Sequence, residues 1–282
     1  MGSPDTHATD LPEPATPQGR EGLRALLAHP GDTVIALDFD GTLAPIVADP
    51  EQARAHPGAL AALAALAPKV AAVAVVTGRP AEVAVAYGGF AGAAGLDHLV
   101  VLGHYGAERW DAATGRVTTP DPHPGVAAAR AALPEILRPV EGAWVEDKGH
   151  AVAVHTRRAA DPQAAFDALR APLTGLATES GLIVEPGRLV LELRPPGMDK
   201  GVALEKFVTE TGARAVLYGG DDLGDLPAYT AVEKLRVTGT PGLLVCSGGD
   251  EVSPQLKERA DVEVDGPAGV VALLHALARH LT

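Results

Sequence analysis

Short apolar segments with no polar interruption recur along the sequence and alternate with segments of helical pattern. The segments "TVIALDF" (33–39), "VAAVAVVTG" (70–78) and "HLVVLG" (98–103) are too short for buried helices and suit strands covered on both faces. Between them, "GALAALAALA" (58–67) and "PAEVAVAYGG" (80–89) suit helices. Repeated strand–helix–strand order implies right-handed crossovers and therefore a parallel sheet.

The pattern changes in the middle of the chain. "AWVEDKGHAVAVHTRR" (143–158) predicts two strands joined by a tight turn, and "GRLVLELRP" (187–195) predicts another strand. Two helical segments, "PGVAAARAALPEIL" and "DPQAAFDALRAPL", accompany them. After Asp199 the first pattern returns, so we predict an α/β fold with a Rossmann-like parallel-sheet core, interrupted by a smaller α+β domain. The expected boundaries are a disordered tail over 1–22, the core over 23–109 and 197–282, and the insert over 110–196.

Composition excludes several classes of protein. The formal net charge is −13, which argues against non-specific binding to nucleic acid or anionic membranes. The only cysteine is Cys246, so no intrachain disulfide can form, which fits a reducing compartment. The N-terminal residues lack the layout of a signal peptide, and no apolar run reaches the roughly 20 residues of a membrane span. We therefore expect a cytoplasmic, monomeric protein.

Reactive side chains cluster where the predicted parallel strands end, which is where open parallel sheets bind ligands. Asp38 and Asp40 lie two residues apart, so both can face one cavity. Thr77, Gly78 and Arg79 precede a helix N-terminus, a natural anion site. The other two clusters are Lys200, at the start of a helix, and the acidic loop "GDDLGD" (220–225), which contains Asp221, Asp222 and Asp225.

Two converging acidic clusters would repel each other unless a cation joined them. Mg²⁺ fits, because it prefers hard oxygen ligands and binds through one or two carboxylates plus water or phosphate oxygens. A metal, a lysine, a hydroxyl and helix-end N–H groups around a carboxylate suit phosphoryl transfer. One carboxylate can act as nucleophile and form an aspartyl-phosphate, and the other can move the proton.

Four motifs, "DFDGTL", "TGR", "DKG" and "GDDLGD", in this order resemble those of the haloacid dehalogenase superfamily of phosphatases. The insert resembles that superfamily's C2-type cap. The resemblance implies that Asp38 is the nucleophile and a Mg²⁺ ligand and that Asp40 is the general acid/base, with its backbone carbonyl on the metal. It also implies that Thr77 and Lys200 hold the phosphoryl group and that Asp221 binds the metal. Asp225 would support it directly or through water, and Asp222 stays open between the metal shell and loop structure.

The insert carries charged pairs at i, i+2 spacing, with apolar residues facing the other way, and such a surface suits the hydroxyls of a sugar. The stretches "GHYGAE", "VEDKGHAVAVHTR" and "LELRPPGMDKG" resemble the trehalose-6-phosphate phosphatase family. The resemblance implies that Glu146, Lys148 and Glu192 bind the disaccharide with support from His155 or Arg194. The remaining residues expected at the substrate are Gly78, Arg79, His104, Glu108 and Asp222.

The expected function is Mg²⁺-dependent hydrolysis of trehalose 6-phosphate through an aspartyl-phosphate. Alternatives are the same chemistry on sucrose 6-phosphate or mannosyl-3-phosphoglycerate, a receiver-like signalling domain, and a non-catalytic sugar-phosphate sensor. The presence of a cap and the chain length oppose the receiver, and the Asp38/Asp40 pair opposes the sensor. The chain departs from the family at Gly224-Asp225-Leu226, where Thr-Asp-Glu is common, and at Tyr105, where histidine is frequent.

Overall fold

The structure is a computed structural model that describes residues 11–47, 49–249 and 252–281. The chain divides into two compact units. The first contains residues 1–119 and 199–282, and the second, called the insert below, contains residues 120–198. None of the described helices is long and apolar enough to cross a membrane.

An eight-stranded sheet forms the centre of the first unit, in the order β12-β11-β10-β1-β2-β3-β4-β5. The strands from β12 to β3 are parallel, whereas β4 and β5 add to the edge in antiparallel direction. This confirms the predicted α/β class with a mostly parallel sheet. The strands are β1 (Thr33–Leu37), β2 (Ala72–Val76), β3 (Leu99–Gly103), β4 (Glu108–Asp111), β5 (Arg116–Thr118), β10 (Ala215–Gly220), β11 (Gly242–Gly248) and β12 (Val262–Asp265).

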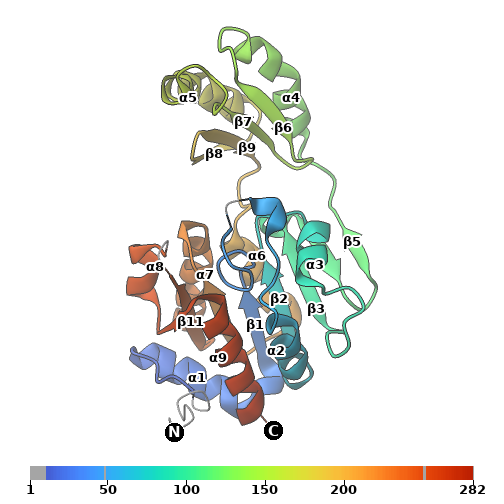
Figure 1. Cartoon of the computed structure of the whole chain (residues 1–282), viewed down its shortest axis with the longest axis vertical. Helices are drawn as coiled ribbons and strands as arrows, with labels where there is room; N and C mark the ends of the chain where they lie inside the picture. Colours follow the sequence, from blue (N-terminus) through green and yellow to red (C-terminus); the bar gives the residue numbers. More distant parts are fainter. Residues whose placement is uncertain (1–10, 48, 250–251, 282) are drawn as a thin grey trace, which may run out of the picture. The chain divides into compact units, whose positions relative to one another are not determined.

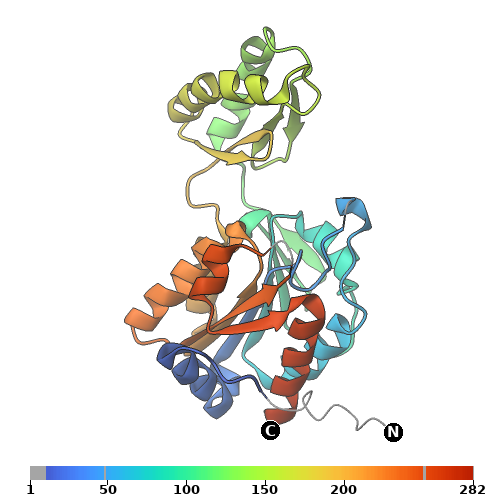
Figure 2. The ribbon, with the colours of Figure 1, turned by 60° about the vertical axis from the view of Figure 1, so that its left-hand side comes forward.

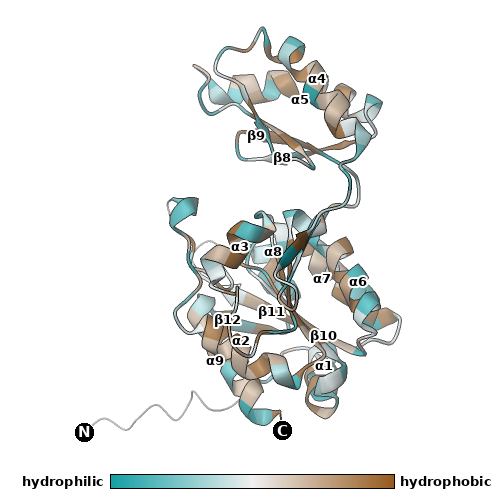
Figure 3. Ribbon diagram, turned by 90° about the vertical axis from the view of Figure 1, so that its right-hand side faces the viewer, coloured by the Kyte–Doolittle hydropathy of each residue, from teal (hydrophilic) through white to brown (hydrophobic). Residues whose placement is uncertain are grey.

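Helices cover both faces of this sheet (Figures 1 and 2). Alternate strand residues feed two apolar clusters, one under α1, α2, α3 and α9 and one under α6, α7 and α8. The strands themselves are coloured mostly as hydrophobic in Figure 3, as expected for a sheet buried on both faces. The helices are α1 (Pro17–Ala28), α2 (Ala59–Leu66), α3 (Ala81–Gly88), α6 (Lys200–Thr211), α7 (Leu226–Val237), α8 (Pro254–Arg259) and α9 (Gly266–His280).

The strand order reverses beside β1. From β1 the chain continues to β2 and β3 on one side, and later returns to place β10, β11 and β12 on the other. The carboxyl ends of β1 and β10 therefore flank a topological switch point, which is where ligands bind in sheets of this kind. Asp38 follows β1 directly and Asp221 follows β10 directly.

Residues 110–119, expected in the insert, belong to the first unit. Strand β4 pairs with β3 in antiparallel direction, with Glu108 opposite Gly103 and Asp111 opposite Val100, and β5 pairs with β4. Trp110 is 4% exposed and joins the apolar cluster beneath α3. Burial of this large side chain fixes the hairpin on the core sheet, and alternating polar residues around it gave the segment the appearance of an insert strand.

The expectation of a disordered tail over residues 1–22 is wrong for residues 17–22, which begin α1; residues 1–10 lie outside the described residues. Pro17 occupies the first turn, and the Thr16 side chain accepts a hydrogen bond from the Gly19 N–H at 2.9 Å. A Cβ on Gly22 would lie 1.9 Å from the Gly242 carbonyl oxygen, so glycine allows α1 to approach β11 closely. The polar composition of this segment concealed its packing.

The insert is an antiparallel sheet in the order β6-β7-β9-β8 with two helices. Val152, Val154, Leu191 and Leu193 on one sheet face pack against both helices in a separate apolar core. Strand β8 was not predicted, because Pro186 interrupts its pattern, yet proline is tolerated at a sheet edge. The elements are β6 (Trp144–Asp147), β7 (Val152–His155), β8 (Ile183–Gly187), β9 (Val190–Arg194), α4 (Pro124–Leu137) and α5 (Pro162–Glu179).

Candidate active site

Asp38 and Lys200 form a buried ion pair at the carboxyl end of β1. The Asp38 N–H donates to the Gly219 carbonyl at 2.8 Å, which fixes the end of β1 against β10. The Lys200 ammonium lies 2.8 Å from the Asp38 carboxylate, and both residues are 4% exposed. Lys200 is the first residue of α6, and the Asp199 side chain caps that helix by accepting from the Val202 N–H at 2.9 Å. The helix cap thus determines where the lysine enters the site.

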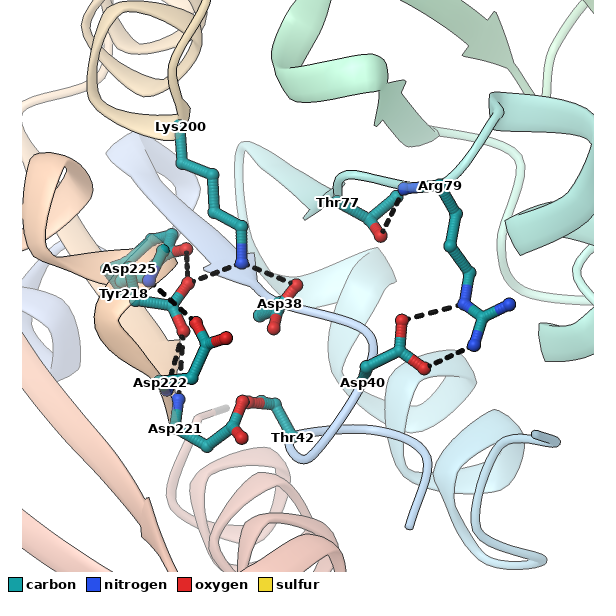
Figure 4. Close-up of polar contacts among 11 residues, drawn as sticks. Asp38, Asp40, Thr42, Thr77, Arg79, Lys200, Tyr218, Asp221, Asp222 and Asp225 are labelled. Carbon is teal, nitrogen blue, oxygen red and sulfur yellow. Dashed lines mark hydrogen bonds and ion pairs between the residues drawn. The ribbon is translucent and has the colours of Figure 1, made fainter. Parts of the chain in front are cut away.

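Asp225 accepts four hydrogen bonds and is fully buried (Figure 4). One oxygen accepts from Lys200 at 2.7 Å and from the Tyr218 hydroxyl at 2.6 Å. The other accepts from the backbone N–H groups of Asp221 at 2.9 Å and Asp222 at 3.2 Å. Asp225 therefore fixes both the lysine and the acidic loop. Tyr218 was missed, although a tyrosine inside the buried segment "AVLYGG" signals that its hydroxyl needs a partner.

Carboxylate oxygens of Asp38, Asp221 and Asp225 all lie within 4.8 Å of one another, so these residues could hold a metal ion. Burial raises the pKa of Asp38 well above its usual range; Lys200 opposes this shift, and the charges of Asp225 and Asp221 add to it. Burial, with the charges of Asp225 and Asp222, raises the pKa of Asp221 to about 7. For Lys200, burial disfavours the charged ammonium, but Asp225 and Asp38 outweigh it and raise its pKa.

This electrostatic imbalance fits a cation. Three buried carboxylates face one ammonium, and their hard oxygens are the ligands that Mg²⁺ prefers. Because both Asp225 oxygens already accept two hydrogen bonds each, Asp38 and Asp221 have the more accessible oxygens, which favours an indirect role for Asp225. The side chain of Asp40 is not a member of this trio.

The turn after Asp40 brings the two acidic motifs together. Gly41 adopts φ +75°, and a Cβ there would lie 2.0 Å from the Asp221 carboxylate. Only glycine combines that backbone conformation with that close approach. The Gly41 N–H donates to the Ala44 carbonyl at 2.7 Å, and the Ser247 hydroxyl donates to the Gly41 carbonyl at 2.7 Å. The glycine of "DFDGT" thus sets the distance between the first and fourth motifs.

Asp40 and Arg79 form a two-point ion pair. Arg79 Nε lies 2.7 Å from one Asp40 oxygen, and Nη2 lies 2.8 Å from the other (Figure 4). Thr77 is buried, and its hydroxyl accepts from the Arg79 N–H at 3.1 Å. Gly78 lies against the Tyr105 ring, since a Cβ there would be 2.8 Å from the ring hydroxyl. The structure thus joins the first and second motifs, and Arg79 contacts Asp40.

His104 and Glu108 hold the loop between β3 and β4. His104 Nδ1 lies 3.4 Å from Glu108, whose other oxygen accepts from the Ala81 N–H at 2.7 Å, at the start of α3. His104 and Tyr105 both have positive φ, 45° and 58°, an uncommon conformation for residues other than glycine. Backbone bonds from His104 N to Arg79 O and from Tyr105 N to Thr77 O, each 2.9 Å, stabilise it. His104 and Glu108 are the two of these residues that were expected at the substrate, and in the structure they contact the "TGR" loop and the start of α3.

In the insert, the predicted charged residues share the sheet face opposite the apolar core. Glu146 lies 2.8 Å from His155, and Lys148 lies 2.5 Å from Glu192. Arg194 pairs with Glu185 at 2.8 Å. Glu185 was missed, because β8 was not predicted; it lies directly opposite Glu192 across the sheet.

An aromatic group extends this charged face. The Trp144 ring stacks on His155 with centroids 4.6 Å apart and an interplanar angle of 11°, and the Arg158 guanidinium lies 4.3 Å from the Trp144 centroid. Carboxylates, ammonium and guanidinium groups and an aromatic ring on one open sheet face offer both donors and acceptors to a polyhydroxylated ligand.

Asp222, also expected at the substrate, lies in the first unit and caps the turn Leu223–Asp225 by accepting from the Gly224 N–H at 2.8 Å.

Known proteins share this sequence pattern. The sequence model of the trehalose-phosphatase family matches residues 36–262. The trehalose-phosphate phosphatase of Mycobacterium avium is 33% identical over 98% of this chain and 69% of the relative. An uncharacterized glycosyl hydrolase of Mycobacterium tuberculosis is 38% identical over 87% of this chain, and the chain spans only 18% of that relative.

Solved structures share the fold. The trehalose-6-phosphate phosphatase of Aspergillus fumigatus matches with a TM-score of 0.73 at 22% identity, covering 95% of this chain and 99% of that one. A haloacid dehalogenase-like hydrolase from Bacteroides thetaiotaomicron matches with a TM-score of 0.56 at 17% identity, covering 86% and 98%. At such identities the likeness concerns the fold, and it agrees with the predicted parallel-sheet core.

Proposed function

The chain belongs to the trehalose-phosphatase family, and on that premise we propose that it hydrolyses trehalose 6-phosphate to trehalose and phosphate. The observation that carries this proposal is the arrangement of the first unit. A buried carboxylate, Asp38, lies against Lys200 at a strand end, and the second carboxylate of the pair, Asp40, lies two residues along the chain. That arrangement suits phosphoryl transfer to a carboxylate.

In the proposed reaction, one Asp38 oxygen attacks phosphorus while the bond from phosphorus to the sugar oxygen breaks. Asp40 donates a proton to the departing oxygen, which leaves as the trehalose hydroxyl. Asp40, then a carboxylate, accepts a proton from water, whose oxygen attacks the aspartyl-phosphate and releases phosphate and free Asp38. Lys200 and the Thr77 hydroxyl stabilise the negative charge of the transferring group.

We propose that Asp38 and Asp221 hold Mg²⁺, with the Asp40 carbonyl as a further ligand and Asp225 in support. When bound, the ion would neutralise charge on the phosphoryl oxygens and orient the group for attack. The chain's own residues prepare the site: Asp225 fixes the acidic loop through the N–H groups of Asp221 and Asp222. The raised pKa values of Asp38 and Asp221 support this proposal, because burial, with the charges of neighbouring aspartates, disfavours both ionised carboxylates, and a bound cation would offset that cost.

Substrate recognition is proposed for the charged face of the insert. Glu146, Lys148 and Glu192 supply acceptors and donors for sugar hydroxyls, and His155 and Arg194 keep them in place through their ion pairs. A small phosphate ester without a sugar would not use this face. The choice of trehalose over other disaccharides rests on the family and on the relatives named for trehalose phosphate.

The proposal is tested by phosphate release from trehalose 6-phosphate, sucrose 6-phosphate, mannosyl-3-phosphoglycerate and glucose 6-phosphate, each with Mg²⁺ and with a chelator. We expect the highest kcat/KM for trehalose 6-phosphate, and we expect no phosphate release from any substrate in the presence of the chelator. A higher kcat/KM for another sugar phosphate would show that the proposed substrate is wrong. Undiminished turnover in the presence of chelator would show that the reaction does not need the proposed metal. Binding of trehalose 6-phosphate without turnover would indicate the non-catalytic sensor.

A further inference from the structure

We propose that Arg79, supported by Tyr87, is a positioning residue that holds Asp40 in place as the general acid. This inference rests on the proposed phosphatase chemistry and assigns to Arg79 a role other than substrate binding. It concerns the first unit only. The contacts that carry it join three separate segments: the turn after β1, the "TGR" loop after β2, and α3.

The guanidinium of Arg79 occupies both oxygens of Asp40. Nε and Nη2 lie 2.7 and 2.8 Å from the two oxygens, which is the parallel two-bond geometry that fixes a carboxylate in both position and rotation. The Arg79 side chain is 17% exposed and that of Asp40 is 39% exposed. A side chain as exposed as Asp40 would otherwise sample several rotamers, and the arginine restricts them. The two-bond contact holds the carboxylate form; when Asp40 carries the proton, its unprotonated oxygen can keep the bond to Arg79 while the other oxygen presents the proton to the departing sugar oxygen.

Arg79 is itself fixed at the main chain and at the side chain. Its N–H donates to the Thr77 hydroxyl, and its carbonyl accepts from the His104 N–H at 2.9 Å. The Tyr87 ring of α3 lies beneath the guanidinium, with Cζ 5.2 Å from the ring centroid, within cation–π range. The hydrogen bonds that Arg79 donates to the Asp40 carboxylate raise the pKa of Arg79, so the guanidinium remains charged.

A second arginine completes the support of Tyr87. Arg54 lies 4.2 Å from the centroid of the same ring, and its guanidinium donates to the carbonyls of Glu51 at 2.8 Å and Ala53 at 2.6 Å. The Ala55 N–H donates to the Tyr87 carbonyl at 3.1 Å. The segment 51–55 therefore holds Tyr87, and the chain of contacts Arg54, Tyr87, Arg79, Asp40 ends at the acid.

If Arg79 positions the general acid, the effect of losing Arg79 on the cleavage rate depends on the leaving group of the substrate. When the bond from phosphorus to a sugar oxygen breaks, the electron pair moves to that oxygen, which is a poor leaving group and needs the Asp40 proton. When p-nitrophenyl phosphate is cleaved, the phenolate leaves without a proton. A residue that positions the acid therefore matters for the sugar ester and little for the aryl ester. A residue that binds phosphate matters equally for both.

The experiment compares kcat/KM of Arg79→Gln on trehalose 6-phosphate and on p-nitrophenyl phosphate. This constant is chosen because it covers only the steps up to release of the first product, so slow hydrolysis of the aspartyl-phosphate does not affect it. We expect a loss of about 10- to 100-fold on the sugar ester, as for a misplaced catalytic group, and a loss of no more than about threefold on the aryl ester. Arg116→Gln on β5 is the matched control, expected to change neither.

A double-mutant cycle separates positioning from general damage. Asp40→Asn should show the same selective loss, and Asp40→Asn/Arg79→Gln should lose no more than Asp40→Asn alone, because the arginine then has no acid to position. Tyr87→Phe, which keeps the ring, should retain the wild-type ratio between the two esters, and Tyr87→Leu should shift it toward that of Arg79→Gln.

Equal losses of Arg79→Gln on both esters, or additive losses in the double variant, would overturn the inference. Faster cleavage of the sugar ester by Arg79→Gln would also overturn it, since Arg79 would then restrain Asp40 instead of positioning it. If the wild type cleaves p-nitrophenyl phosphate but not trehalose 6-phosphate, the proposed substrate fails. The same comparison is then made with whichever sugar phosphate the wild type accepts, so that the two failures remain distinct.

Discussion

Replacing Asp225 by asparagine tests whether the buried network holds the site together. The substitution keeps the shape of the side chain but turns one acceptor oxygen into an NH₂ group. In the protein each Asp225 oxygen accepts two hydrogen bonds, so either orientation of the amide leaves two donors without an acceptor, and at least one of the two is buried. The NH₂ group would face either Lys200 and Tyr218 or the backbone N–H groups of the acidic loop.

The magnitude follows from these contacts. Each buried donor without a partner costs about 1–3 kcal/mol, which gives about 1–6 kcal/mol for one or two such donors. Removing the charge of Asp225 also relieves its repulsion of Asp38 and Asp221, which offsets part of that cost. We expect the free energy of unfolding of the first unit to fall by about 3 kcal/mol, or about 6–12 °C in Tm.

Tryptophan fluorescence can report on the first unit alone. The chain has two tryptophans, Trp110 in the first unit and Trp144 in the insert. In a Trp144→Phe background, Trp110 follows unfolding of the unit that contains Asp225. Asp49→Asn is the matched control, because Asp49 caps an exposed turn, a position where asparagine caps equally well. Equal free energies of unfolding for the Asp225 variant and this control would refute the reasoning.

Three further predictions concern the metal, the turn and the insert. Burial raises the pKa of Asp221 to about 7, and a protonated carboxyl cannot bind a metal. The protein should therefore bind Mg²⁺ at full affinity above that pH, and the affinity should fall about tenfold for each pH unit below it. Calorimetric titrations between about pH 6 and pH 8 measure this affinity, and a constant value across that range would contradict the prediction. Gly41→Ala should abolish phosphate release and lower Tm, because it places a Cβ against Asp221 and puts alanine at positive φ, a cost of about 1–2 kcal/mol; Gly115→Ala, at a positive-φ turn with open space for the Cβ, is the control for strain alone. Glu146→Ala should lower kcat/KM for trehalose 6-phosphate about tenfold, the effect of one lost charged hydrogen bond, and leave cleavage of p-nitrophenyl phosphate intact; a parallel loss on both esters would mean that this face does not recognise the sugar.

The sequence predicted those parts of the molecule that depend on local pattern. The buried strands of the first unit were predicted because a continuous apolar run of five or six residues admits few other structures, and β1 lies within the expected segment 33–39. The convergence of Asp38, Lys200 and the acidic loop followed from the rule that parallel strands end at one edge. These inferences need only the order of motifs along the chain.

Features that depend on distant partners escaped prediction. Helix α1 begins in a polar segment whose packing relies on Gly22 lying against Gly242, which is 220 residues further along the chain. Strand β8 is stabilised by its neighbour β9, which compensates for the proline that hides its pattern. The contact between Arg79 and Asp40 was also missed, because spacing along the chain says which residues meet at an edge but not which side chains pair.

The central claim, that Asp38 attacks trehalose 6-phosphate, is tested most directly by trapping the intermediate. The protein is mixed with trehalose 6-phosphate and Mg²⁺, quenched in acid within one turnover, and digested for mass spectrometry. The account predicts that one phosphoryl group resides on Asp38 and that Asp38→Asn carries none while remaining folded. Phosphate on another residue, or turnover by Asp38→Asn at the wild-type rate, would contradict it.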